Sequence, residues 1–340
     1  MPPPIPTPAE YPGPLGPPVA APAGEGPKPP PAAPSFDGSS AAPFGGAMFG
    51  PTLPSVLYRV FWAPDQPVRG QPTDLGLVRE DFAVTAPVWQ DPANELSFSA
   101  RLRSEILNEN ATFPVSGERL PDDLWNIGFG GSYRHNFDND WTAGAGVLIG
   151  SASDKPFHGW DEMNTGLNAF LRVPHGDHDA WLFTLMYSPT AQIPFPIPGV
   201  AYAWAPSDQF RMNVGLPFQM TYRPTDDLTF SFSYMLLTTV HAQVAYHCWG
   251  PIRVYAGYDW ENEAYLPADR PDTKDRLFSY DMRLSGGVQA ALGGRWMLDF
   301  SSGYLFDRFY AFGNSSALST QDRIDAGAGP FLGLSCMMRW

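Results

Sequence analysis

The sequence lacks any long apolar run. Nowhere does it hold the ~18 consecutive apolar residues that a membrane-spanning helix needs. Charge is also scarce, since Asp, Glu, Lys and Arg make up 16% of the residues, against about a quarter in a typical soluble domain. The 340 residues could form two ordinary domains or one barrel of many strands. If the chain crosses a bilayer, a closed β-barrel is the remaining way to do so.

Cysteine is nearly absent as well. The two cysteines, Cys248 and Cys336, form no CxxC pair and have no spacing suited to a metal. The net charge of −14 would repel phosphates, so we expect no nucleic-acid partner. The opening Met1-Pro2-Pro3-Pro4 has neither a basic n-region nor an apolar h-region, so we expect the printed start to be mature or misassigned.

Glycine, proline and aromatic residues are abundant. The chain has 33 glycines, 38 prolines and 14% aromatics, a mixture typical of many strands and turns. Prolines fill 15 of the first 34 positions, which predicts a disordered or polyproline-like tail over residues 1–50 and a barrel over residues 51–340. The tail is either a periplasmic spacer that touches the cell wall or an unstructured extension without a site.

From Ser55 onward, apolar residues alternate with small or polar ones, which places one set on each face of a strand. Phe278, Tyr280, Met282 and Leu284 show the pattern clearly, because Ser279, Asp281, Arg283 and Ser285 stand between them. In a membrane barrel, one face would meet lipid and the other a polar interior. The alternating runs are Val56 to Trp62, Phe82 to Val88, Leu96 to Leu102, Trp125 to Tyr133, Trp141 to Ile149, Leu167 to Val173, Trp181 to Tyr187, Phe210 to Tyr222, Leu228 to Tyr246, Ile252 to Trp260, Phe278 to Ala290, Trp296 to Phe306 and Ile324 to Trp340.

The run from Leu228 to Tyr246 is nearly twice the ~9–11 residues that a membrane strand requires. A turn at Leu237-Thr238-Thr239 would divide it into a hairpin without changing the faces. The sequence therefore predicts an all-β, transmembrane, antiparallel barrel of 14 strands, with 12 as the alternative. Short turns such as Asn136 to Asp140 would lie on the periplasmic side, and long loops such as Ser188 to Gln209 outside.

Tryptophans gather at the ends of the alternating runs, where an indole can bury its ring and keep its N–H in water. This distribution predicts aromatic girdles at the two membrane surfaces rather than aromatics that cap the core of a soluble barrel. The girdle residues are Trp62, Trp125, Trp141, Trp181, Trp260, Trp296 and Trp340.

Charged residues fall on the face that we expect to point inward, including Arg59 and Arg79 in the early runs. The predicted lumen-lining charges are Arg101, Arg103, Arg134, Arg172, Arg211, Arg253, Asp259, Glu261, Asp281, Arg283, Asp299 and Asp307. Facing one another across a lumen, they would form a transverse field that orients polar solutes. Paired into salt bridges, they would instead plug a narrow barrel. Both interpretations remain open at this point.

Only His175-Gly176-Asp177-His178-Asp179 resembles a metal site, and a solvated hairpin turn explains this cluster better. A lipid hydrolase would need a serine nucleophile, a histidine base and an orienting group. His241 and His247 with Ser231 or Ser233 could supply them, but no motif selects these residues. We expect no cofactor, no metal and no catalytic residue.

Several short motifs carry a resemblance to a known family. They include Gly215-Leu216-Pro217, Gly257-Tyr258-Asp259-Trp260-Glu261 and Gly303-Tyr304-Leu305-Phe306-Asp307. Over roughly residues 198–340, the chain resembles an uncharacterised family of outer-membrane-like barrels from planctomycete-type bacteria, a domain of unknown function. The resemblance implies a barrel and supplies no reaction or ligand.

Together these observations predict a porin-like channel for small polar solutes in the bacterial outer membrane, with outer-membrane lipid as its surroundings. The alternative is a plugged, anchoring barrel that binds a cell-envelope protein or the cell wall. An outer-membrane lipid hydrolase is a third hypothesis.

Overall fold

The computed structural model describes residues 51–108, 110–189, 195–235, 238–314 and 322–340. The proposed tail over residues 1–50 lies outside this part of the chain. Within the described part, no helix is long and apolar enough to cross a membrane. The strands are β1 (Ser55–Pro67), β2 (Asp74–Gln90), β3 (Asn94–Asn108), β4 (Asp123–Asn136), β5 (Thr142–Ser153), β6 (Met163–His175), β7 (Asp179–Tyr187), β8 (Ile197–Ser207), β9 (Phe210–Gly215), β10 (Phe218–Tyr222), β11 (Leu228–Met235), β12 (Thr239–Trp249), β13 (Ile252–Tyr265), β14 (Arg276–Leu292), β15 (Trp296–Gly313), β16 (Arg323–Ala326) and β17 (Gly329–Arg339).

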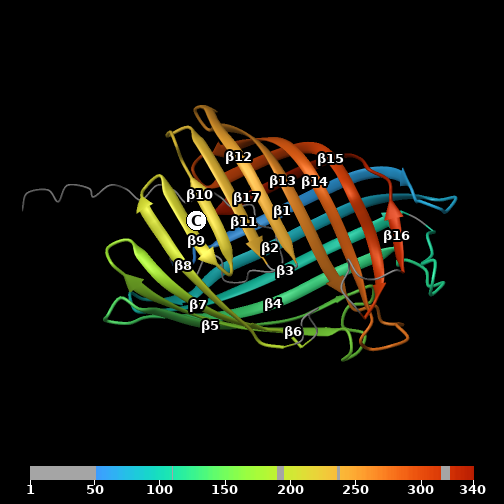
Figure 1. Ribbon diagram of the computed structural model, residues 1–340, viewed down its shortest axis with the longest axis horizontal. Helices are drawn as coiled ribbons and strands as arrows, with labels where there is room; N and C mark the ends of the chain where they lie inside the picture. Colours follow the sequence, from blue (N-terminus) through green and yellow to red (C-terminus); the bar gives the residue numbers. More distant parts are fainter. Residues whose placement is uncertain (1–50, 109, 190–194, 236–237, 315–321) are drawn as a thin grey trace, which may run out of the picture. The chain divides into compact units, whose positions relative to one another are not determined.

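These strands close into one antiparallel barrel (Figure 1). Each strand pairs with its neighbours in sequence, and β1 closes the ring by pairing with β17, with Ser55 opposite Arg339. Both β16 and β17 pair with the same edge of β15 and form one strand interrupted at residues 327–328. The 17 elements therefore make a barrel of 16 strands.

The prediction of 14 strands is wrong, as is the alternative of 12, and the error has two sources. The segment Ser188 to Gln209, predicted as a long loop, contains β8, which pairs with both β7 and β9. The run Phe210 to Tyr222, predicted as one strand, is the hairpin of β9 and β10. The division of the Leu228 run is confirmed, since Met235 of β11 lies opposite Thr239 of β12.

The two ends of the barrel differ. At one end, here called the turn end, lie the start of β1, the end of β17 and the short connections 91–93, 137–141, 176–178, 208–209, 223–227, 250–251 and 293–295. At the opposite end, the loop end, lie the longer connections 68–73, 109–122, 154–162, 188–196, 266–275 and 314–322. The two-residue connection 216–217 and the three-residue connection 236–238 also belong to the loop end. The strands that these two connections join, β9 to β12, are short, whereas β1–β3 and β13–β15 are longer.

The outer face of the barrel carries a belt of exposed apolar side chains. Phe129, Leu284 and Phe300 are each about half exposed, at 51%, 54% and 52%. Complete burial of such a side chain is worth ~1.5–3 kcal/mol, so half-exposed side chains in water forfeit about half of this each, and a face made of them requires an apolar surrounding. On β13 the belt runs from Ile252 to Trp260, close to the ~9 residues that a membrane strand needs.

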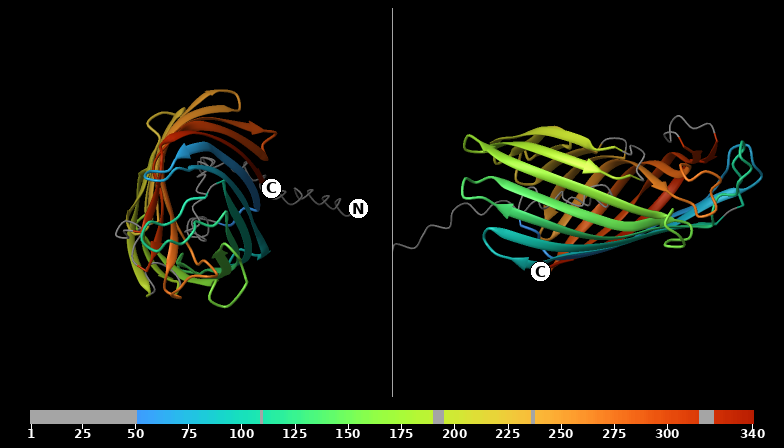
Figure 2. Two further views of the ribbon diagram at one scale, coloured as in Figure 1. Left: turned by 90° about the vertical axis from the view of Figure 1, so that its right-hand side faces the viewer. Right: turned by 90° about the horizontal axis from the view of Figure 1, so that it is seen from below.

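Inside the loop end, a compact apolar cluster fills the barrel. Leu75, Leu277 and Tyr310 point inward from β2, β14 and β15 and are fully buried. Residues 110–122 fold back inside the strands, where the rings of Phe113 and Phe312 pack at a tilt of 40° with their centroids 5.7 Å apart. The view from the loop end shows this turquoise loop within the ring of strands (Figure 2). One sector of the barrel is therefore filled at this end.

Candidate functional site

The predicted girdle residues lie on the outer face at two levels. Trp141, Trp181, Trp296 and Trp340 lie at the turn end, where they are 40–52% exposed. Trp62 lies toward the loop end and is 47% exposed. Trp125 and Trp260 lie at the same level and are half-buried.

The structure turns nearly all the predicted lumen charges inward. The strand register and the alternation place Arg101, Arg103, Arg134, Arg172, Arg211, Arg253, Asp259, Glu261, Asp281, Arg283 and Asp299 on the inner face. Asp307 is the exception. The register shifts between Tyr280 and Met282, so that β15 carries an extra residue there, and Asp307 adopts a φ of 48°. Because such a bulge reverses the alternation, Asp307 is exposed on the outer side, and its predicted place in the lumen is wrong.

The charges near the loop end form one buried network that joins opposite walls. Arg79 of β2 contacts Glu261 of β13 at 3.1 Å and Asp281 of β14 at 3.0 Å. Arg103 of β3 contacts Glu261 at 2.9 Å and Glu263 at 2.6 Å. These strands are not neighbours in the sheet, so the ion pairs cross the interior. They hold β2 and β3 against β13 and β14.

The remaining members complete the network. Arg283 contacts Glu261 at 2.9 Å, and Arg79 also contacts Glu105 at 2.8 Å. Arg103 pairs with Asp81 at 2.5 Å. The side chains of Arg79, Arg103, Arg283, Asp81, Glu105, Glu261, Glu263 and Asp281 are all at most 13% exposed. Buried charges remain ionised only when paired in this way. The network therefore occupies the interior between β2–β3 and β13–β14 and holds these strands together.

Three members of the network were not predicted, although each has the same inward phase as its neighbours: Asp81, Glu105 and Glu263. The predicted alternating run ended at Leu102, before Glu105, and Glu263 lies in a segment predicted as a loop. Continuing the alternation past the outer girdle would have found both. The pairing across the barrel has no signal in the sequence, because it depends on how the sheet closes.

The opposite sector has a different inner wall. On β10 to β12 and at Gly257 of β13, most inward positions are small or uncharged polar residues of intermediate exposure, here called the polar wall. They are Gln219, Thr221, Thr229, Ser231, Ser233, Gln243 and Gly257. On β6 to β8, the inward Phe170, Leu182 and Ala201 are buried. One sector of the interior is thus held by charge pairs, while the polar wall carries hydrogen-bonding groups that are partly exposed.

The residues named for a hydrolase lie on this wall. Ser233 stands opposite His241, whose Nδ1 lies 2.6 Å from Oδ1 of Asp259. Cross-strand neighbours of this kind resemble a nucleophile, a base and an orienting carboxylate. They face the interior, whereas a lipid ester would approach from the outer face. This placement does not suit the lipid hydrolase that the sequence suggested.

The histidine cluster of residues 175–179 does not converge on a metal position. Asp179 accepts a hydrogen bond of 2.7 Å from the Tyr202 hydroxyl, and His175 packs edge-on against the Tyr202 ring. Among the described residues, no group of His, Cys, Asp and Glu side chains is arranged to hold a metal ion.

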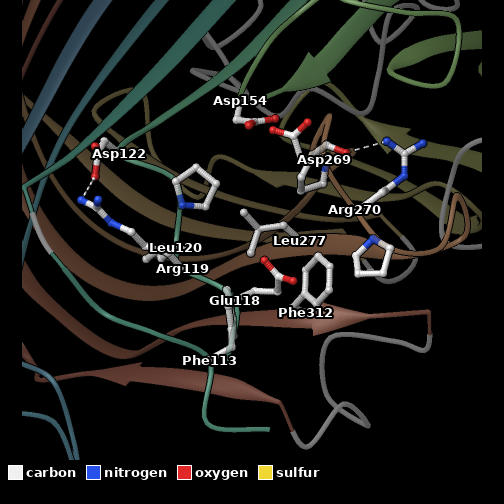
Figure 3. Close-up of a pocket in the computed structure, with 13 residues that line it drawn as sticks. Phe113, Glu118, Arg119, Leu120, Asp122, Asp154, Asp269, Arg270, Leu277 and Phe312 are labelled. Carbon is white, nitrogen blue, oxygen red and sulfur yellow. Dashed lines mark hydrogen bonds and ion pairs between the residues drawn. The ribbon is translucent and has the colours of Figure 1, made fainter. Parts of the chain in front are cut away.

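A cavity of about 250 Å³ opens between the loops at the loop end (Figure 3). Its lining combines apolar Leu120, Leu277 and Phe312 with several carboxylates. Lys155 donates a hydrogen bond to Asp269, which raises the pKa of Lys155 and lowers that of Asp269. These groups hold the loops to one another, so the cavity is a recess of the folded loops.

The geometry defines the class of the protein as a closed antiparallel barrel with an apolar exterior and a partly accessible polar interior. No model of a known family and no curated protein matches the chain. Among solved structures, it is similar to an outer membrane channel from Pseudomonas putida, at 10% identity and a TM-score of 0.36, covering 86% of this chain and 97% of the other. It is also similar to OpdD of Pseudomonas aeruginosa, at 12% identity and 0.37, covering 85% and 100%. A third similar structure is a mutant porin of Rh. blastica, at 10% identity and a TM-score of 0.36, covering 85% of this chain and 100% of the other.

Proposed function

We propose that this chain is an outer-membrane channel for small polar solutes. The closed ring of strands leaves no free sheet edge, as a lipid environment demands. On β13 the apolar belt spans close to the ~9 residues that a membrane strand needs, and most short turns lie at one end with the long loops at the other, as in bacterial outer-membrane barrels. The role of the N-terminal tail and the binding of a cell-envelope partner are separate proposals.

The observation that carries the proposal is the division of the interior. The charges that would obstruct a pore are paired with one another between β2–β3 and β13–β14. The polar wall of β10–β13 keeps its hydroxyl and amide groups accessible. A path lined by small, hydrated, uncharged groups lets solutes pass without strong binding at any one step.

Reconstitution in a planar bilayer tests the channel directly. The folded protein should produce discrete conductance steps, because the hydroxyl and amide groups of the polar wall are partly exposed inside the barrel. Protein unfolded by heating in detergent is the matched control and should give none. Silent bilayers, with protein whose compact fold is verified by heat-modifiable gel migration, would contradict the proposal.

A second candidate is a plugged, anchoring barrel, and one observation favours it. Residues 110–122 and the charge network fill one sector near the loop end. Replacing residues 111–120 with a short glycine and serine linker should then turn a silent barrel into a conducting one. If the original protein already conducts, and the shortened loop changes only the size of the steps, the anchoring role loses its structural basis.

A further inference from the structure

Three arginines gather on the accessible side of the interior at the turn end. Arg211 of β9 lies opposite Thr221 and is exposed to the interior. Arg223 follows β10 at the next inward position, since its N–H bonds to the carbonyl of Gln209. Arg253 points inward from β13. We call these three residues the arginine cluster.

The three guanidinium groups are close enough for their charges to act on one another. Arg223 lies in the turn after β10, where partial burial and the neighbouring charge of Arg211 lower its pKa. Arg253 lies opposite His247 of β12, whose N–H bonds to the carbonyl of Asp227 in the same turn as Arg223. Like charges held together on one wall cost free energy, and an anion between them recovers it.

The surrounding wall supplies little negative charge. Among the described residues of β5 to β12, the single acidic side chain is Asp179, which bonds to the outward-facing Tyr202. Asp299 points inward from β15 and accepts a hydrogen bond of 3.1 Å from Tyr255. Asp227 contacts His247 at the rim.

Acidic residues elsewhere are used differently. Asp208 and Asp226 lie in the turns at the rim, where salt screens them over about 10 Å. The carboxylates of the charge network are bound to Arg79, Arg103 and Arg283 at the loop end. The inward Asp259 of β13 lies 2.6 Å from His241 and 3.5 Å from Arg283. Among the described inward residues of β9 to β13 near the turn end, the charge is therefore positive, even though the whole chain carries a net charge of −14.

We propose that the arginine cluster is a binding site for small oxyanions, such as carboxylates and phosphates, and makes the channel anion-selective. This inference rests on the proposed channel function and names its substrate class. A guanidinium group presents parallel N–H donors that match two oxygens of a carboxylate or phosphate. Three such groups at one mouth would concentrate these anions before they meet the uncharged polar wall.

The reversal potential in a potassium chloride gradient tests the inference. The protein should favour chloride over potassium about threefold, because the charge in the accessible lumen is positive. The double variant R211Q/R253Q should bring this ratio close to unity. R69Q/K274Q removes two exposed positive charges from loop-end connections and serves as the matched control, which should keep the selectivity.

Cation selectivity in the unmodified protein, or anion selectivity that R211Q/R253Q leaves unchanged, would overturn the inference while leaving the channel intact. If bilayers stay silent, a second measurement tests the oxyanion site by itself. It is the phosphorus NMR line width of inorganic phosphate mixed with the detergent-solubilised barrel. Broadening that R211Q/R253Q abolishes would retain the oxyanion site and reject the channel. No broadening with the unmodified barrel would reject both.

Discussion

Replacing Glu261 with Gln is expected to lower the free energy of unfolding by about 3–5 kcal/mol, the largest effect of any single change considered. The Glu261 carboxylate contacts Arg79 at 3.1 Å and both Arg103 and Arg283 at 2.9 Å. The neutral amide keeps the shape of the side chain but removes the negative charge, and this leaves three buried guanidinium groups near one another. Unfolding in denaturant, followed by gel migration without heating, measures the difference.

Glu80→Gln is the matched control for this change. Glu80 lies on the outer side of β2, where it accepts a hydrogen bond of 3.3 Å from the Tyr58 hydroxyl. Its replacement should alter stability by about 0.5 kcal/mol or less, as for most substitutions away from buried networks. Equal stability of the Glu261 and Glu80 variants would mean that water, rather than the ion pairs, stabilises the charges of this sector.

Arginine at position 244 should cost about 2–4 kcal/mol of stability in a bilayer, whereas arginine at position 243 should cost far less. Val244 lies near the middle of β12 on the outer face, between Phe230 and Ala256 of the adjacent strands. Gln243 points inward beside Ser231 and Gly257, which leave room for a longer, hydrated side chain.

Folding into vesicles measures this second prediction. The two variants differ by one position and carry the same added charge, so composition and net charge cannot explain a difference between them. Val244→Arg should fold into lipid poorly, and Gln243→Arg should fold like the unmodified protein. The reverse order would mean that the faces of β12 are assigned the wrong way round.

The sequence predicted the fold class because alternation is a local property. In β14, Phe278 to Ala290 carries its pattern without reference to any partner strand. The predicted strand number was too low partly because β9 and β10 were taken as one strand. The tight turn at Leu216-Pro217 leaves apolar residues on even positions in both strands. A hairpin that preserves the phase therefore reads as one longer strand. β8 was predicted as a loop because Pro198 and Pro206 give it the composition of one.

The site was predictable only in part. The phase of Arg103 and Glu261 identified inward charges, but the contact between them joins residues 158 positions apart. Whether such charges face an open lumen or pair across it depends on the cross-section of the closed barrel, which no local pattern encodes. Asp307 was misplaced for a related reason, since the bulge that turns it outward becomes visible only in the register of β14 and β15.

Thiol labelling along β11 and β12 tests the central claim most directly, namely that alternate side chains meet lipid and a water-filled interior. With Cys248 and Cys336 replaced by serine, single cysteines are placed at Ser231, Ser233 and Gln243, or at Phe230, Phe232 and Val244. In vesicles, a small water-soluble thiol reagent should label the first three positions and spare the other three. Equal labelling of both sets, or labelling of the second set alone, would contradict the account.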